Sequence, residues 1–259
     1  MPNKVALITG ASSGLGAEFA RLAARDGHDV VLVARREPLL AELGAELTKA
    51  HGVAAHAIAL DLGDPAAPQR LFDEVTRRGL SVDVLVNNAG FGSNGAFLDL
   101  PLAREVEMVE VNDQALLKLC WLFGRGMRER KAGRILNVAS TAGFQAGPFM
   151  ATYYASKSFV LLFSEALHHE LRGSGVTVTA HCPGATETGF AKASGNDKSK
   201  LFQSRKPATS AEVAAHGWKA MKAGRAVAVH GALNAIAAFS LRVSPRGVVR
   251  SIAASLNKE

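Results

Sequence analysis

The sequence has few cysteines, the residues whose disulfides stabilise small secreted domains, and none of the long apolar runs that cross membranes. Its 259 residues include two cysteines, Cys120 and Cys182, in apolar surroundings and without paired spacing. We expect buried reduced thiols rather than a disulfide or zinc site. No run approaches the roughly 20 apolar residues of a spanning helix, and the apolar run near Val5 is too short for a signal peptide. These features predict a cytoplasmic protein.

Aromatic residues are also scarce, at 6% of the chain, and the eight histidines show no metal-ligand spacing. The chain is 48% hydrophobic and rich in Gly and Ala, which suits tightly packed helix–sheet layers in one α/β domain over 1–259. The net charge is +7 and is unevenly distributed. From Glu187 onward, twelve Lys or Arg and four Asp or Glu give a charge of +8, and the residues before Glu187 carry −1. Phosphates, acidic carrier proteins, an anionic membrane or solvent are all compatible with this charge. No motif indicates nucleic acid.

A short apolar run at 4–9 ends in GASSGLG, and a helical pattern follows. Strand, glycine turn and helix together present backbone N–H groups and a helix N-terminus to a phosphate. Gly10, Gly14 and Gly16 have a spacing that differs from the usual dinucleotide pattern but permits the same close approach. Apolar runs then alternate with helical patterns. This alternation predicts a Rossmann-like doubly wound parallel sheet of about seven strands, with helices on both faces and a helical C-terminal extension.

Polar residues gather where the expected strands end, and ligands of such sheets bind beyond those carboxyl ends. The second strand ends at Ala34, where NAD-binding proteins usually carry an acidic residue, and Arg35 and Arg36 follow. Two guanidiniums suit a 2′-phosphate, which favours NADP over NAD; the alternative is that they cap the next helix. Asp61, after the third strand, either reaches the adenine or caps the following helix.

Ser140, Tyr153 and Lys157 form the expected acid–base site. Tyr153 and Lys157 are four residues apart, so on a helix they project from one face. A cation beside a phenol should lower its pKa from the usual value of about 10, so that the phenol can exchange a proton with an alcohol or carbonyl. Ser140 could hold the same oxygen. Asn112 lies inside a long helical stretch, where its amide needs a satisfying neighbour or bends the helix around a water.

The sequence resembles the short-chain dehydrogenase/reductase family. The motifs that carry the resemblance follow the family's order over about 4–190: TGASSGLG (9–16), NNAG (87–90), Asn112, Ser140, YYASK (153–157) and PGATET (183–188). The resemblance implies an NADP(H)-dependent oxidoreductase that interconverts a carbonyl and a secondary alcohol. It also implies a homodimer or homotetramer formed through the helices at 104–130 and 152–172.

The resemblance implies a role for each catalytic residue. Tyr153 would be the acid in reduction and the base in oxidation, and Lys157 would lower its pKa and bind the nicotinamide ribose. Ser140 would hold the substrate oxygen, and Asn112 would support a water that relays protons to Lys157. Thr188 would contact the nicotinamide carboxamide. The implied cofactor-binding set is Gly10, Ser12, Ser13, Gly14, Leu15, Gly16, Arg35, Arg36, Asp61, Leu62, Asn88, Ala89, Gly90, Tyr153, Lys157, Pro183, Gly184, Thr186 and Thr188.

One departure concerns Ser13, which stands where many NADP-preferring members carry a basic residue. The NADP preference therefore depends on Arg35 and Arg36. A non-catalytic NADP-binding sensor is an alternative function, but it would have no need of the four catalytic residues together.

The last seventy residues carry the remaining predictions. Residues 188–210 are polar and lysine-rich, which indicates a mobile substrate loop. The tail, 232–257, contains two apolar helical stretches split at Ser244-Pro245, with one face formed by Val248, Val249, Ile252 and Leu256, and a cationic row formed by Arg242, Arg246 and Arg250. The tail could pack or pair subunits, lie on an acidic membrane as a peripheral membrane protein, or gate substrate. A hydrophobic ketone suits the tail, and an acyl thioester on an acidic carrier suits the charge.

Overall fold

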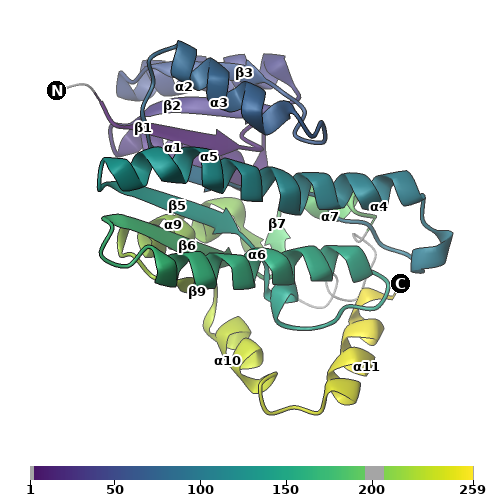
Figure 1. The fold of residues 1–259 in the computed structure, drawn as a ribbon. Helices are drawn as coiled ribbons and strands as arrows, with labels where there is room; N and C mark the ends of the chain where they lie inside the picture. The colour runs from purple at the N-terminus through teal and green to yellow at the C-terminus, as the bar shows by residue number, and fades with distance from the viewer. Residues whose placement is uncertain (1–2, 196–206, 259) are drawn as a thin grey trace.

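The computed structural model describes residues 3–195 and 207–258, and seven parallel strands form its main sheet (Figure 1). Their order is β3-β2-β1-β4-β5-β6-β9. Strand β1 pairs with β2 on one side and β4 on the other, so the topological switch point lies at the carboxyl ends of β1 and β4. The predicted fold class is confirmed. The strands are β1 (Val5–Thr9), β2 (Asp29–Ala34), β3 (Ala55–Ala59), β4 (Val82–Asn87), β5 (Gly133–Val138), β6 (Val176–Cys182) and β9 (Val227–Val229).

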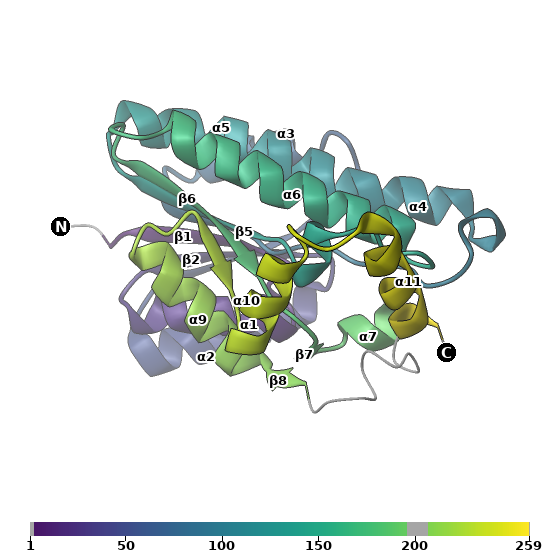
Figure 2. The ribbon, with the colours of Figure 1, turned by 90° about the horizontal axis from the view of Figure 1, so that it is seen from below.

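Helices cover both faces of the sheet, and Figure 2 shows the three layers. One core forms under α1, α2 and α9, and the other under α3, α5 and α6. The apolar runs of the central strands are buried on both sides, as expected for a parallel sheet between helix layers. The helices are α1 (Gly14–Arg25), α2 (Glu37–His51), α3 (Ala67–Arg77), α4 (Leu102–Val109), α5 (Leu116–Glu129), α6 (Ala151–Glu170), α7 (Phe190–Ala193), α9 (Ser210–Lys222), α10 (Ala232–Ser240) and α11 (Arg246–Asn257), with 3-10 helices η1 (Phe97–Asp99) and η3 (Thr141–Phe144).

The long helix predicted across Asn112 is interrupted. A π-helical segment, η2 (Glu110–Ala115), separates α4 from α5 and contains this asparagine. Such segments leave backbone groups outside the regular ladder and occur often at functional sites. The apolar stripe read from the sequence did not reveal the interruption.

A second, two-stranded sheet was not predicted. Strand β7 (Thr186–Glu187) pairs in parallel with β8 (Ala208–Thr209), and strands of two residues give no readable alternation. Helix α9, expected after Ser210, is capped by Thr209, which exchanges hydrogen bonds with Glu212 in a capping box. The predicted substrate loop, 188–210, lies outside the described residues at 196–206.

The tail forms two helices that diverge from the domain as a V in Figure 1, with the turn at 241–245 furthest from the sheet. In α11, Val248 and Ile252 are exposed, whereas Ala253 and Asn257 are buried. The outer residues of the predicted apolar face are therefore not covered by the domain. No helix in the described part of the chain is long and apolar enough to cross a membrane.

Candidate active site

The turn after β1 requires glycine. Gly10 and Gly14 have φ values of +66° and +55°, in the left-handed region. A Cβ added to Gly16 would lie 2.2 Å from the Gly10 carbonyl oxygen. Ser13 precedes α1 but makes no side-chain cap, which leaves the first N–H groups of the helix for a ligand, and Leu15 packs against the core. This cradle fits the phosphates of a dinucleotide.

The start of the NNAG motif supports this turn from strand β4. Thr9 Oγ1 accepts hydrogen bonds of 3.0 Å from the backbone N–H groups of both Asn88 and Ala89. Asn88 Nδ2 in turn donates to the carbonyl oxygens of Thr9 at 2.9 Å and Gly10 at 3.3 Å. These two residues, predicted to bind cofactor, thus hold the glycine turn in place.

The two arginines after β2 point to different partners. Arg36 Nη2 donates to Ser12 Oγ at 2.8 Å and to Ser13 Oγ at 2.9 Å, so its guanidinium lies on the glycine turn. Its charge therefore occupies the place where Ser13 lacks one. Arg35 is exposed, with Nη1 3.9 Å from the Asp61 carboxylate.

Asp61 and Leu62 follow β3 at the same edge. The Asp61 carboxylate accepts a hydrogen bond of 3.0 Å from the backbone N–H of Gly63, in a turn that precedes α3. That helix begins at Ala67 without a side-chain cap, so the capping role considered from the sequence is wrong. Its side chain remains exposed and paired with Arg35, whereas Leu62 is buried in the core.

Tyr153, Lys157 and Ser140 come together as predicted. Helix α6 carries the tyrosine and the lysine, and the Lys157 Nζ lies 5.8 Å from the Tyr153 ring centroid. Ser140 follows β5, and its hydroxyl lies near enough to the Tyr153 hydroxyl to lower the pKa of that phenol. Lys157 Nζ donates to the Val138 carbonyl oxygen at 2.9 Å, which fixes the buried ammonium between strand and helix.

The expected lowering of the tyrosine pKa is wrong for this structure. Burial raises the pKa of Tyr153 to about 12, against a smaller lowering by the Ser140 hydrogen bond. Burial also lowers the pKa of Lys157 to about 8, although the nearby Asp113 carboxylate opposes that shift. Burial of Asp113 raises its pKa to about 6, with Lys157 opposing. Desolvation thus outweighs the pairing on which the sequence argument relied.

Asn112 is satisfied by neighbours. Its Oδ1 accepts from the Phe91 N–H at 3.1 Å, and its Nδ2 donates to the Phe91 carbonyl and to Ser156 Oγ, both at 3.0 Å. A Cβ on Gly90 would lie 2.9 Å from Asn112 Oδ1 and 3.5 Å from Lys157 Nζ. The asparagine amide therefore joins the NNAG stretch to the catalytic helix, and Gly90 allows that close approach.

The turn after β6 lies beside Ser140 and the glycine turn. Pro183 accepts from the Thr141 N–H at 2.8 Å, and Thr186 Oγ1 donates to the Gly184 carbonyl at 2.9 Å. Thr188 Cγ2 would be 3.3 Å from a Cβ added to Gly14. The PGATET segment thus spans from the acid–base group to the phosphate cradle.

A family model described as short chain dehydrogenase matches residues 4–199, which contain this whole arrangement. The chain belongs to the short-chain dehydrogenase family. It is 40% identical over 193 residues to a monensin polyketide synthase putative ketoacyl reductase of Streptomyces virginiae, covering 73% of each chain. It is 40% identical over 177 residues to a very-long-chain 3-oxoacyl-CoA reductase of Laccaria bicolor, covering 67% of this chain and 52% of that one. A solved short-chain dehydrogenase from Sphingobium yanoikuyae in complex with NADPH superposes with a TM-score of 0.83 at 32% identity, covering 95% of each chain.

Sequence reasoning missed the apolar residues around Tyr153 of this short-chain dehydrogenase. The Phe190 ring lies 5.1 Å from the Tyr153 ring, and Tyr153 is only 9% exposed. Phe91, Met108 and Met150 belong to the same cluster. The position of Phe190, two residues after the PGATET motif, was the available signal, but a lone aromatic on a short helix does not reveal which ring it covers.

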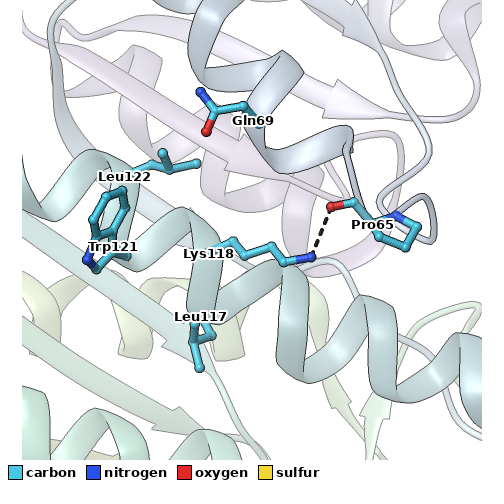
Figure 3. Close-up of a pocket in the computed structure, with 6 residues that line it drawn as sticks. All are labelled: Pro65, Gln69, Leu117, Lys118, Trp121 and Leu122. Atoms are coloured by element: carbon cyan, nitrogen blue, oxygen red, sulfur yellow. Dashed lines mark hydrogen bonds between the residues drawn. The ribbon is translucent and has the colours of Figure 1, made fainter.

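A separate groove of about 340 Å³ lies on the outer face of α5, with Trp121, Leu117, Leu122, Pro65 and Gln69 among its lining residues (Figure 3). Lys118 Nζ donates to the Pro65 carbonyl across it at 2.9 Å. Trp121 is 59% exposed. No residue of the acid–base group lines this groove. Four of its lining residues, Leu117, Lys118, Trp121 and Leu122, lie in the helix at 104–130 that was expected to pair subunits.

Proposed function

We propose that this short-chain dehydrogenase is an NADP(H)-dependent reductase that interconverts a carbonyl and a secondary alcohol. The observation that carries the proposal is the placement of Ser140 and Lys157 beside Tyr153: the serine hydroxyl lowers the pKa of the phenol, and Lys157 Nζ lies 5.8 Å from the ring. A carbonyl oxygen placed at these two hydroxyls would be held and polarised where negative charge develops. Bound at the neighbouring cradle, the nicotinamide would supply the hydride.

The protonation states at neutral pH suit reduction. With a pKa of about 12, Tyr153 carries its proton at pH 7 and is ready to donate it to the substrate oxygen as the carbonyl is reduced. Lys157, with a pKa of about 8, remains mostly charged and stabilises the phenolate that results. Asn112 holds Phe91 and Ser156, and the π-helical segment around it frees backbone groups for a water that returns the proton.

The NADP preference rests on two guanidiniums at the ribose end of the cradle. Arg36 bridges Ser12 and Ser13, and Arg35 is exposed beside Asp61. Arg35 Nη1 lies 3.7 Å from the Glu107 carboxylate and 3.9 Å from that of Asp61, whereas Arg36 already lies on the turn, so Arg36 is the better placed of the two for a 2′-phosphate. The NADPH complex of the Sphingobium relative supports this choice of cofactor.

The substrate that the site favours is an apolar ketone or a 3-oxoacyl thioester. Phe91, Phe190, Met108 and Met150 surround Tyr153 with apolar surface. Two of the relatives described above carry names of ketoacyl or 3-oxoacyl reductases, and this supports the choice of substrate.

We also propose that the chain forms a homodimer or homotetramer through the outer faces of α5 and α6. Leu117 and Trp121 on α5 and Leu162 on α6 are large exposed apolar side chains. A substitution of Trp121 by Glu should lower the mass measured by light scattering after size exclusion. An unchanged mass would remove this face from the proposal.

The test of the reaction is NADPH oxidation, followed by absorbance, across ketones, aldehydes and 3-oxoacyl thioesters. Tyr153→Phe should lower turnover about 10²- to 10⁴-fold, the usual contribution of a general acid, while NADPH affinity stays within a few fold. Tyr154→Phe is the matched control, since it removes a neighbouring buried phenol that bonds Asn257 instead of Ser140. Undiminished turnover in Tyr153→Phe would overturn the mechanism. Tight NADPH binding without turnover on any compound would favour the sensor.

A further inference from the structure

The turn between α10 and α11 carries large apolar residues into solvent. Phe239 is 67% and Val243 80% exposed, and together with the exposed arginines Arg242, Arg246 and Arg250 we call them the basic tip. Figure 1 shows this part of the tail standing off from the sheet and its helices. Large exposed apolar side chains beside a row of arginines indicate a surface that meets a partner.

The charge around the basic tip has one sign. From Val213 to Lys258 the sequence contains seven Lys or Arg and no Asp or Glu. Four of these cations, the three arginines of the basic tip and Lys258, lie in or next to the two tail helices. A surface of this charge complements an anionic partner and repels a cationic one.

Both ends of the tail contact the domain, one at the start of α6 and the other at the turn after β6. Asn257, fully buried, accepts from the Tyr154 hydroxyl at 3.2 Å and donates to the Pro148 carbonyl at 3.0 Å. At the other end, Asn234 of α10 lies against Gly184, where a Cβ would meet its amide nitrogen at 2.5 Å. The polar contacts are made at the two ends, which leaves the basic tip between them free to contact another surface.

We propose that the basic tip binds the surface of an anionic phospholipid bilayer. With nine residues, α10 is about 14 Å long, too short to span a bilayer of about 30 Å, so the tip would rest at the interface with Phe239 and Val243 among the acyl chains. The arginines would then meet lipid phosphates.

Two other occupants fit less well. A second copy placed symmetrically on the same surface would bring the Arg242, Arg246 and Arg250 rows together without any acidic residue of the tail to separate them. An acidic protein would need a groove shaped for a protruding tip, whereas a lipid interface accepts a convex apolar surface directly. The inference does not depend on the proposed reaction.

The test is co-sedimentation of the full-length protein with phosphatidylcholine vesicles that contain either no or equal parts phosphatidylglycerol. We expect binding to the anionic vesicles and little to the neutral ones, weakening with salt. Removing three interfacial cations in Arg242→Gln/Arg246→Gln/Arg250→Gln should weaken the partition coefficient on the order of 100-fold. The matched control Lys49→Gln/Arg128→Gln/Arg172→Gln changes net charge equally at exposed sites elsewhere.

The apolar contribution has its own variant. Phe239→Ser/Val243→Ser should weaken binding at least tenfold without changing charge, whereas Leu39→Ser, an exposed apolar site on α2, should not. Equal sedimentation with neutral and anionic vesicles, or wild-type binding by both tip variants, would overturn the proposal. If wild type fails to bind and Phe239→Ser/Val243→Ser lowers the mass in solution, the tip is a subunit contact and the proposal is wrong.

Discussion

Replacing His181 with leucine should make the protein less sensitive to acid. His181 lies in β6, fully buried, and neither ring nitrogen has a hydrogen-bond partner among the described residues. Its ring lies 6.2 Å from that of Phe19 and 5.7 Å from that of His216, which is itself 5.3 Å from His230. Burial, helped by the two neighbouring histidines, lowers the pKa of His181 to about 3.

The sign and size of the effect follow from linkage. An unfolded histidine, with a pKa of about 6.5, takes up a proton below that pH, whereas folded His181 stays neutral down to about pH 3. Its contribution to stability is therefore intact above pH 6.5 and is lost as the pH falls from 6.5 toward 3. At pH 5, which is about 1.5 units below the pKa of the unfolded histidine, the loss of stability is about 2 kcal/mol. Leucine does not titrate, so this loss should disappear.

Urea unfolding at pH 7.5 and pH 5.0, followed by circular dichroism, measures the difference. The stability lost between the two pH values should be about 2 kcal/mol smaller in His181→Leu than in wild type. Comparing each variant with itself at two pH values cancels any change in packing that leucine causes. His169→Leu, at an exposed position, should behave as wild type. An identical loss in His181→Leu and wild type would refute the assignment of this acid sensitivity to His181.

Three further changes test the cofactor cradle and the charges near Lys157. Gly16→Ala places a Cβ against the Gly10 carbonyl oxygen and should weaken NADPH binding on the order of 100-fold in fluorescence titrations, with the circular dichroism spectrum retained. Arg36→Gln should weaken NADPH about tenfold and leave NADH unchanged, whereas equal losses for both nucleotides would contradict its place at the 2′-phosphate. Asp113→Asn removes the carboxylate that raises the pKa of Lys157, so the alkaline fall in kcat/KM should move to lower pH. A pH profile like that of wild type would show that Asp113 does not influence the pKa of Lys157.

The sequence predicted the parts of the site that depend on the parallel direction of the strands and on local backbone geometry. Because parallel strands end at one edge, residues that follow β1, β2, β5 and β6 had to gather there, and they do. The glycine turn was readable because the left-handed φ values found at Gly10 and Gly14 strongly favour glycine. The spacing of Tyr153 and Lys157 was readable because helical periodicity fixes it.

The sequence could not predict the partners of individual side chains, because these contacts are set by the tertiary structure. Arg35 and Arg36 are adjacent in sequence, yet one pairs with Asp61 and the other with Ser12 and Ser13. Nothing in the order of residues distinguishes these destinations, because they depend on which way the first turn of α2 faces. The position of Phe190 over Tyr153 is likewise a tertiary contact with no local pattern.

The error about Tyr153 shows which physical effect sets the chemistry of this site. The sequence argument used a charge next to a phenol, which is a local interaction between residues four apart. Burial depends on the whole fold, and it moves Tyr153, Lys157 and Asp113 each toward its neutral form, giving pKa values of about 12, 8 and 6. At pH 7 this leaves a protonated phenol beside a charged lysine and a charged aspartate. A protonated phenol can give its proton to a substrate oxygen but cannot take one up, so in the proposed reaction the resting site is prepared to reduce a carbonyl. Oxidation would first require the phenol to lose its proton, which positive charge brought near it would favour.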